Sequence, residues 1–306
     1  MRNSRNDRRD ILVPHSQERV HRKLLKQVIS YFVIIFTMAG CGFAVKQARH
    51  PFPPEGMVYV PEGWFLMGSS EEDGRPGMAV GVDEMPRHRV WLKGFYIDRH
   101  EVSVGEFREF MLTTNRKVPR IWRVEAWVAM YPEPKDNHPM NGVTWYDADD
   151  FCRKAGKRLP TEAEWEKAAR GTDGRQFPWG DEPGALGNIR ANTIEAEIDW
   201  TMPMGSYPEG VSPYGVHDMA GNVMEWTSSW YQSYAGSDLK REAFGEKYKV
   251  MKGGAWENPE VPFARSAHRH AVDPIWDHPG HGFRCAKHFI PAAPWRGLSV
   301  LLLNQD

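Results

Sequence analysis

Residues 172–222 are the feature that most limits how this chain can fold, because they contain many turn residues and almost no helical or strand period. A loop region of this length inside a compact domain is normally functional or held together by ligands. The chain of 306 residues also has 28 Gly and 23 Pro beside 13 Trp, 14 Phe and 10 Tyr. Many aromatic residues combined with many breakers predict a large core held among long loops rather than a helical bundle.

The charge of the chain is nearly balanced but unevenly distributed. The formal net charge is −1, while residues 1–26 carry eight Lys or Arg against three Asp or Glu. The remainder is therefore mildly acidic, which gives no electrostatic argument for nucleic acid as a partner. The chain has only three cysteines, which excludes a disulfide-dense miniprotein.

The N-terminal segment has the pattern of a targeting signal. Residues 28–38 form an uncharged, mostly apolar run. This run is shorter than the ~20 residues of a membrane-spanning helix but fits the apolar region of a signal peptide. Met38-Ala39-Gly40-Cys41 then resembles the lipobox of bacterial lipoproteins. The resemblance implies a signal peptide at 1–40, a diacylated Cys41 as the first mature residue, and a tether at 41–56.

Two alternatives to a lipoprotein remain open at this point. The apolar run could be an uncleaved signal anchor, in which case Cys41 is incidental, or the start codon could be misassigned. A lipid anchor and a signal anchor both place the body of the protein outside the inner membrane. We expect the protein in the cell envelope, lipid-anchored at the outer membrane or at the periplasmic face.

The body of the chain reads as one irregular α+β domain, residues 57–290, followed by a tail at 291–306. Three capping boxes predict helices that begin at Ser103, Thr144 and Thr161, because each hydroxyl can accept a backbone N–H bond while an acid three residues later bonds back. The helices are expected to end near Leu112, at Gly156 and at Gly171. Short apolar or aromatic runs predict strands at 57–61, 64–67, 89–92, 95–97, 222–226, 248–251 and 283–286.

Several strings, in order along the body, together resemble the formylglycine-generating enzyme, or sulfatase-modifying factor, family. They are Asn141–Ala148, Phe151-Cys152, Gly156–Glu166, Gly221–Trp226, Lys252–Trp256, Arg265–Ala267 and Gly282–Cys285. The resemblance implies an irregular, loop-rich variant of the C-type-lectin fold. It also implies a reaction in which two cysteines hold copper and a substrate cysteine is oxidised by O₂ to an aldehyde.

This chain departs from the family at the catalytic cysteines. The resemblance puts them at about Asn258 and Phe263, and the segment from Lys252 to Arg284 contains no cysteine. Cys152 and Cys285 match disulfide positions of the family, so we expect them to be bonded to each other. Soft thiolate ligands select Cu(I), whereas an amide and a phenyl ring do not. Whether the chain is an enzyme therefore stays open at the level of sequence.

Histidines offer a second kind of metal chemistry. His268, His270, His278, His281 and His288 crowd into a short segment, and imidazoles can bind zinc, copper or iron. His268, His270 and His281 are the weak catalytic candidates among them. The alternative is that these are loop histidines on a polar surface, and we do not expect copper or iron.

A calcium ion is the expected cofactor. Asp218 and Glu225 flank a glycine turn, and a turn can direct backbone carbonyls and carboxylates at one hard cation. The resemblance implies ligands from the side chains of Asp218 and Glu225 and from the carbonyls of Gly221 and Val223. The alternative is a hydrogen-bonded turn between aromatic strands. A second calcium site could begin at Asn192 and Thr193, with an acidic partner that is ambiguous among Glu195, Glu197 and Asp199.

Arg265, Arg269 and Arg284 stand where relatives line or brace the substrate groove. They could bind an anionic or peptide ligand, or they could form internal salt bridges. The sequence thus predicts an envelope-anchored, calcium-stabilised binding or assembly module whose partner is a peptide, a glycan or an envelope protein. The alternative function is a periplasmic oxidoreductase with histidine-bound metal that acts on a sulfur or aromatic substrate; residual formylglycine formation is a third possibility.

Overall fold

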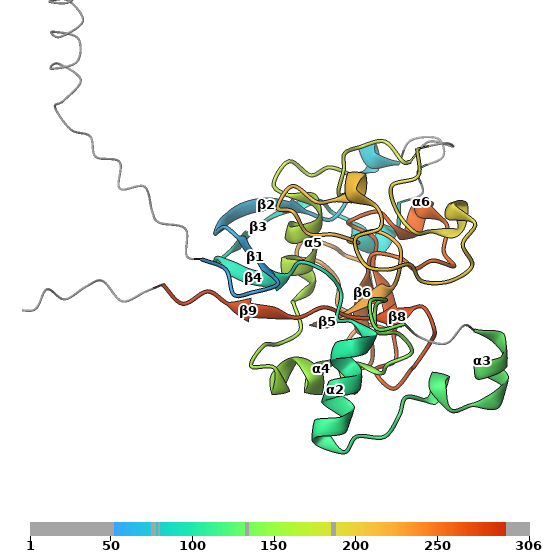
Figure 1. The fold of residues 1–306 in the computed structure, drawn as a ribbon. Coiled ribbons are helices and arrows are strands. Elements are labelled where there is room, and N and C mark those ends of the chain that lie inside the picture. The colour runs from blue at the N-terminus through green and yellow to red at the C-terminus, as the bar shows by residue number, and fades with distance from the viewer. Residues whose placement is uncertain (1–51, 75–77, 79, 132–134, 185–187, 292–306) are drawn as a thin grey trace, which may run out of the picture. The chain divides into compact units, whose positions relative to one another are not determined.

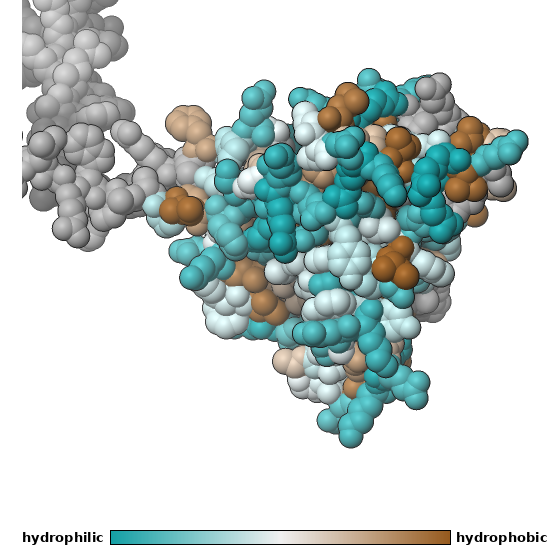
Figure 2. Space-filling view, turned by 90° about the horizontal axis from the view of Figure 1, so that it is seen from below, coloured by the Kyte–Doolittle hydropathy of each residue, from teal (hydrophilic) through white to brown (hydrophobic). Residues whose placement is uncertain are grey.

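The computed structural model describes residues 52–74, 78, 80–131, 135–184 and 188–291. The expected signal peptide, the lipidation site at Cys41, most of the tether and nearly all of the tail lie outside these residues, and the predictions for them stay predictions. Among the described residues, no helix is both long and apolar enough to cross a membrane. On the face seen in Figure 2, hydrophobic residues form small separate spots among hydrophilic ones, so this face offers no broad apolar surface.

Short strands form three small sheets in the described part of the chain (Figure 1). One sheet has the order β1-β4-β9, a second contains β2 and β3, and the third has the order β7-β6-β5-β8. Only the β5–β8 pair is parallel. The strands are β1 (Met57–Val60), β2 (Gly63–Met67), β3 (His88–Leu92), β4 (Phe95–Asp98), β5 (Met224–Trp230), β6 (Lys249–Lys252), β7 (His270–Val272), β8 (His281–Gly282) and β9 (Ala286–His288).

Most strand predictions are confirmed in position, and one is wrong. The strand expected at 283–286 is in fact β9, which begins only at Ala286. The residues before it bond elsewhere: the Phe283 carbonyl accepts from Val102 N, and Cys285 N donates to the Asp98 carboxylate. Neither β7 nor β8 was predicted, because each is only two or three residues long and owes its shape to its neighbours in the sheet.

The three capping boxes are confirmed. The Ser103 hydroxyl accepts from Glu106 N at 3.1 Å, and the Glu106 carboxylate accepts from Ser103 N at 2.8 Å. Thr144 and Thr161 start their helices in the same way. The helices are α2 (Val104–Thr114), α3 (Glu125–Met130), α4 (Trp145–Lys154), α5 (Glu162–Arg170) and α6 (Glu260–Phe263), of which α3 and α6 were not predicted.

The loop region also behaves as its composition predicts. In the described residues between 172 and 222, regular structure is limited to two single-turn 3₁₀ helices, η4 (Ile194–Ala196) and η5 (Pro208–Gly210). Three further 3₁₀ turns lie earlier in the chain, at η1 (Glu71–Asp73), η2 (Val82–Glu84) and η3 (Arg120–Trp122). Short turns of this kind are common connectors.

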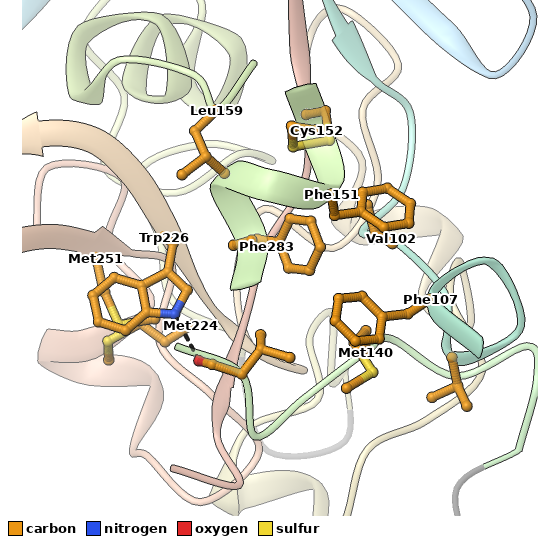
Figure 3. Packing of buried hydrophobic residues seen from close by; sticks show 14 of the residues in the cluster. Val102, Phe107, Met140, Phe151, Cys152, Leu159, Met224, Trp226, Met251 and Phe283 are labelled. Carbon is orange, nitrogen blue, oxygen red and sulfur yellow. Dashed lines mark hydrogen bonds between the residues drawn. A yellow bond between two sulfur atoms is a disulfide. The ribbon is translucent and has the colours of Figure 1, made fainter. Parts of the chain in front are cut away.

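Aromatic rings hold the largest apolar cluster together (Figure 3). The ring of Phe151 on α4 lies 5.8 Å from Phe107 on α2 and 5.4 Å from Phe283. Trp226 on β5 is fully buried, and its indole N–H donates to the Val143 carbonyl at 3.0 Å. This cluster fixes α2 and α4 against the four-stranded sheet, and the loops that leave that sheet form the site described next.

Candidate functional site

A pocket of about 250 Å³ lies where the loops after β6 and after β7 meet the ends of β5 and β8. Its walls combine apolar, aromatic and imidazole side chains with one carboxylate and one amide. The lining residues are Met224, Ala255, Glu257, Asn258, Phe263, His270, Trp276, His278, Gly280 and His281. Asn258 and Phe263, which stand at the expected catalytic cysteine positions, are both among them.

The loop that carries Asn258 and Phe263 folds back closely on the end of β6. The Asn258 side chain accepts from Ala255 N at 2.9 Å, which holds the amide in a local turn. Gly254 has φ +69°, and a Cβ on it would lie 3.1 Å from the Phe263 carbonyl carbon. A glycine is needed here because it alone adopts this backbone conformation without strain and leaves room for α6.

Three of the clustered histidines reach the pocket. His278 pairs with Glu257 at 3.1 Å, and its ring lies 5.2 Å from that of His281. Burial, with smaller effects from His278 and His270, lowers the pKa of His281 to about 3, so its ring is neutral near pH 7. The Nδ1 atom of His281 is buried and has no hydrogen-bond partner among the described residues.

The histidines of the described residues are not grouped as a metal site would require. His268 turns away from the pocket and pairs with Glu84 at 3.5 Å. The described residues contain no group of three or more His, Cys, Asp or Glu side chains arranged to hold a metal ion. The alternative of a histidine-bound metal in His268, His270 and His281 is therefore not favoured.

Two further cavities share Trp276 with this pocket, and this residue is 61% exposed. A second cavity of about 470 Å³ is lined by Tyr248, Ala271, Val272, Asp273 and Trp276. A third, of about 240 Å³, is lined by Arg120, Trp276, Asp277 and His278. We call these three adjoining cavities the groove. Neither Trp276 nor Glu257 was predicted from the sequence, although an Ile-Trp pair inside the histidine-rich segment was a visible signal.

The three arginines that were candidates for ligand binding form internal salt bridges, which is the alternative that the sequence left open for them. Arg265 and Arg284 are fully buried, and Arg269 is 5% exposed. Each makes two hydrogen bonds to one buried carboxylate, as internal salt bridges do. The pairs, which we call the buried ion-pair network, are Arg265–Glu84, Arg269–Glu162 and Arg284–Glu225.

The pKa of Glu84 shows how strongly the network stabilises an ionised carboxylate. Burial alone would raise the pKa of this carboxyl group. Hydrogen bonds from His268 and Arg265, together with their charges, lower it instead to about 2. The carboxylate therefore stays ionised throughout the physiological range, and its two oxygens are already occupied by protein donors.

The expected calcium ligands are only partly available. The Glu225 carboxylate accepts from Arg284 and from the Trp165 indole N–H, so it would have to leave this ion pair to bind a cation. Asp218 has φ 54° and accepts from Gly205 N at 2.7 Å. Near it lies Glu101, 2% exposed, with one carboxylate oxygen that has no partner among the described residues. Burial, then the charge of Asp218, raises the pKa of Glu101 well above its usual value.

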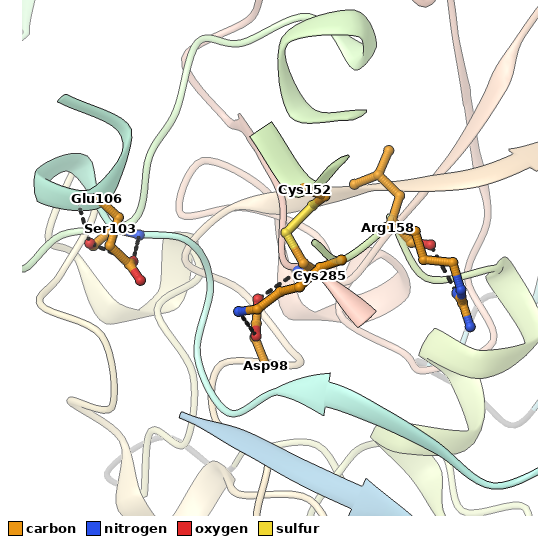
Figure 4. The surroundings of a disulfide bond; sticks show 8 residues. Asp98, Ser103, Glu106, Cys152, Arg158 and Cys285 are labelled. Atoms are coloured by element: carbon orange, nitrogen blue, oxygen red, sulfur yellow. Dashed lines mark hydrogen bonds and ion pairs between the residues drawn. A yellow bond between two sulfur atoms is a disulfide. The ribbon is translucent and has the colours of Figure 1, made fainter. Parts of the chain in front are cut away.

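The predicted disulfide is present (Figure 4). Cys152 on α4 and Cys285 before β9 are bonded across 133 residues. Asp98 supports the bond, because its carboxylate accepts from Cys285 N at 2.9 Å and pairs with Lys157 at 2.7 Å. In the described part of the chain, both cysteines are thus consumed by this bond.

Comparison with known proteins agrees with this fold. A family model described as "Sulfatase-modifying factor enzyme 1-like domain" matches residues 43–289. The structure of PvdO from Pseudomonas aeruginosa superposes with a TM-score of 0.61 at 28% identity, covering 76% of this chain and 94% of that one. The predicted α+β fold, an irregular variant of the C-type-lectin fold, is confirmed.

Sequence relatives carry two different names. Serine/threonine-protein kinase Pkn1 of Chlamydia trachomatis serovar L2 is 36% identical over 250 residues, which are 76% of this chain and 38% of that protein. Formylglycine-generating enzyme of Bos taurus is 30% identical over 298 residues, which cover 79% of this chain and 77% of that enzyme. The chain thus spans well under half of the Pkn1 relative.

Proposed function

This chain belongs to the family of sulfatase-modifying factor enzyme 1-like domains, and from that membership we propose that it is a binding module that does not oxidise cysteine. The observation that carries the proposal is the composition of the pocket. Asn258 and Phe263 line it where the family resemblance expects thiolates. No cysteine lies between Cys152 and Cys285, and these two are bonded to each other.

An extended polypeptide segment is the partner that the groove fits best. Its three cavities all share Trp276 as a lining residue, and a chain can occupy several neighbouring cavities where a compact ligand would fill one. In the described residues β7 pairs only with β6, so its other edge lies open beside Ala271 and Val272. An open strand edge can pair with an added peptide strand, and the aromatic pocket can take one of its side chains.

Peptide selection tests this proposal. A random displayed library is panned against the full chain, and dissociation constants of the enriched peptides are measured by fluorescence anisotropy. Because large aromatic contacts dominate such interfaces, Trp276→Ala should weaken binding at least about ten-fold. Trp91→Ala, which changes another exposed tryptophan outside the groove, is the matched control. Equal affinity in wild type and Trp276→Ala, or binding of glycans alone on an array, would contradict a peptide groove.

A calcium ion is proposed to stabilise the Asp218 turn. Glu101, Asp218 and Glu225 bring three acidic side chains close to Arg284, and the second oxygen of Glu101 lacks a partner. A hard dication would be held by two of these carboxylates together with backbone carbonyls, since calcium accepts both kinds of oxygen ligand. Asp218 and Glu101 would supply carboxylates, and Gly221 and Val223 would supply carbonyls, while Glu225 would stay with Arg284.

Glu101→Gln distinguishes a calcium site from a strained buried acid. If calcium binds, this change should lower the melting temperature and abolish the effect of a chelator, since a bound ligand stabilises the native state. If no ion binds, removing an unpaired buried charge should raise the melting temperature, and the chelator should have no effect on either protein. Calcium content of the purified chain, measured by mass spectrometry, provides the independent readout.

Anchoring in the cell envelope completes the proposed function. Its support is the sequence of residues 28–41, with an apolar run followed by small residues and Cys41. Intact mass of the membrane-extracted chain should show loss of residues 1–40 and added acyl mass. A chain that starts at Met1 without acyl mass would contradict the lipid anchor.

A further inference from the structure

Two tryptophans stand exposed side by side on the hairpin formed by β2 and β3. Trp64 is 54% exposed and Trp91 is 43% exposed, and the two are direct cross-strand partners. The guanidinium of Arg89 lies 5.0 Å from the centre of the Trp64 ring. We call the surface made by Trp64, Trp91, Arg89 and the adjacent Lys93 the hairpin platform.

The opposite face of the hairpin is buried. Phe65 and Met67 alternate with Trp64 along β2 and are buried in a small cluster with Tyr234. Alternation along a strand puts neighbouring residues on opposite faces, so the platform faces outward. The outward face of a hairpin that contacts only water usually carries polar residues. Neighbouring exposed tryptophans are instead typical of surfaces that bind a membrane or another molecule.

The sequence before the hairpin indicates which surface it meets. The chain enters the described domain at β1, and Trp64 follows Met57 by seven residues. Fifteen residues, 42–56, separate Cys41 from Met57. Fully extended, they span about 50 Å, the upper limit that backbone dimensions allow. A chain held in a bilayer at Cys41, or by the apolar run at 28–38, therefore keeps the hairpin platform within reach of lipid.

We propose that the hairpin platform docks on an anionic phospholipid surface. Tryptophan concentrates at the membrane–water boundary because its ring is apolar and its indole N–H is polar. Arg89 and Lys93 are both exposed and can pair with lipid phosphates, and Glu62 is the one acidic residue in the turn between β1 and β2. The proposal rests on the envelope anchoring proposed above, and it adds a fixed orientation of the domain on the membrane.

The experiment uses the full chain reconstituted in vesicles of phosphatidylethanolamine and phosphatidylglycerol. One half of the samples contains lipids brominated near the headgroup, which quench tryptophan fluorescence on contact. Because two of the 13 tryptophans are expected at the boundary, wild type should lose on the order of a tenth of its emission. Trp64→Ser/Trp91→Ser should lose this quenching, while Trp276→Ser, a change at an equally exposed tryptophan of the groove, should keep it.

Hydrogen exchange of wild type gives a second readout that needs no variant. Amides of residues 62–67 and 88–93 should exchange more slowly in vesicles than in detergent.

A chain that does not float with vesicles contradicts the anchoring and with it the docking. A chain that floats but shows equal quenching in wild type and the double variant contradicts the docking alone. Protection of the hairpin that grows with protein concentration in detergent identifies a second copy as the occupant and overturns the lipid surface.

Discussion

The buried ion-pair network and the groove use polar residues in opposite ways. In the network, each arginine makes two hydrogen bonds to one buried glutamate, and the charges are matched inside the fold. In the groove, the low pKa of His281 keeps its ring neutral near pH 7, its Nδ1 atom has no hydrogen-bond partner among the described residues, and Trp276 is largely exposed. The two regions also differ in exposure, because Trp276 is 61% exposed whereas the arginines of the network are buried, so of the two the groove is the one that a ligand can reach.

The largest expected effect comes from breaking the network. Arg269→Met leaves the buried Glu162 without its cation, and removing one partner of a buried pair typically costs about 3–5 kcal/mol. Arg269→Met/Glu162→Gln removes the charge as well and should recover part of this loss. Denaturant unfolding of the two variants and wild type measures both effects. A loss of stability below about 1 kcal/mol in the single variant, together with lost peptide binding, would return Arg269 to the role of ligand-binding residue.

A smaller effect is expected from the pH dependence of the groove. His281 binds a proton in the unfolded chain near pH 6.5 but in the folded chain only near pH 3. Since the unfolded state binds more protons between these values, stability is full above about pH 6.5 and falls as the pH drops toward 3. The slope from this one group reaches about 1.4 kcal/mol per pH unit.

His281→Asn should reduce that slope, and unfolding at a series of pH values measures it. An unchanged slope in His281→Asn would mean that His281 takes up its proton at the same pH in the folded and the unfolded chain, and the description of this ring as neutral would be wrong.

The smallest effect on stability is expected at Trp276. Because its side chain is 61% exposed, Trp276→Ala should change the free energy of unfolding by no more than about 0.5 kcal/mol. The same change should remove most of the peptide affinity. A variant that lost stability and affinity together would indicate that Trp276 supports the loop between β7 and β8 rather than contacting a ligand.

Local signals in the sequence were sufficient to predict the three capped helices and the loop-rich region, but not the ion pairs between distant residues. The helices at Ser103, Thr144 and Thr161 were predictable because a capping box is complete within four residues. The loop-rich character of 172–222 was predictable from its composition. The roles of the arginines were not, since Arg265 and Glu84 are 181 residues apart and Arg269 and Glu162 are 107 apart. Only the folded chain shows which acid each arginine meets.

The features of the candidate sites were likewise only partly predictable from the sequence. The loss of the catalytic thiolates was visible in the sequence, because no cysteine lies between Cys152 and Cys285. The open edge of β7 was not visible, since three residues carry no period and become a strand only by pairing with β6. The proximity of Glu101 to Asp218 was also not visible in the sequence, because the two residues are far apart along the chain and come together only in the fold.

One measurement tests the central claim that the groove binds without oxidising cysteine. The copper-loaded chain is incubated in air with a Cys-x-Pro-x-Arg peptide, and the peptide is then weighed by mass spectrometry. The relative named formylglycine-generating enzyme of Thermomonospora curvata, 30% identical over 294 residues, is run beside it under the same conditions. We predict that this chain returns the peptide unchanged under conditions in which the relative converts it to the aldehyde. Aldehyde formed by this chain, and persisting in Cys152→Ser/Cys285→Ser, would contradict the account.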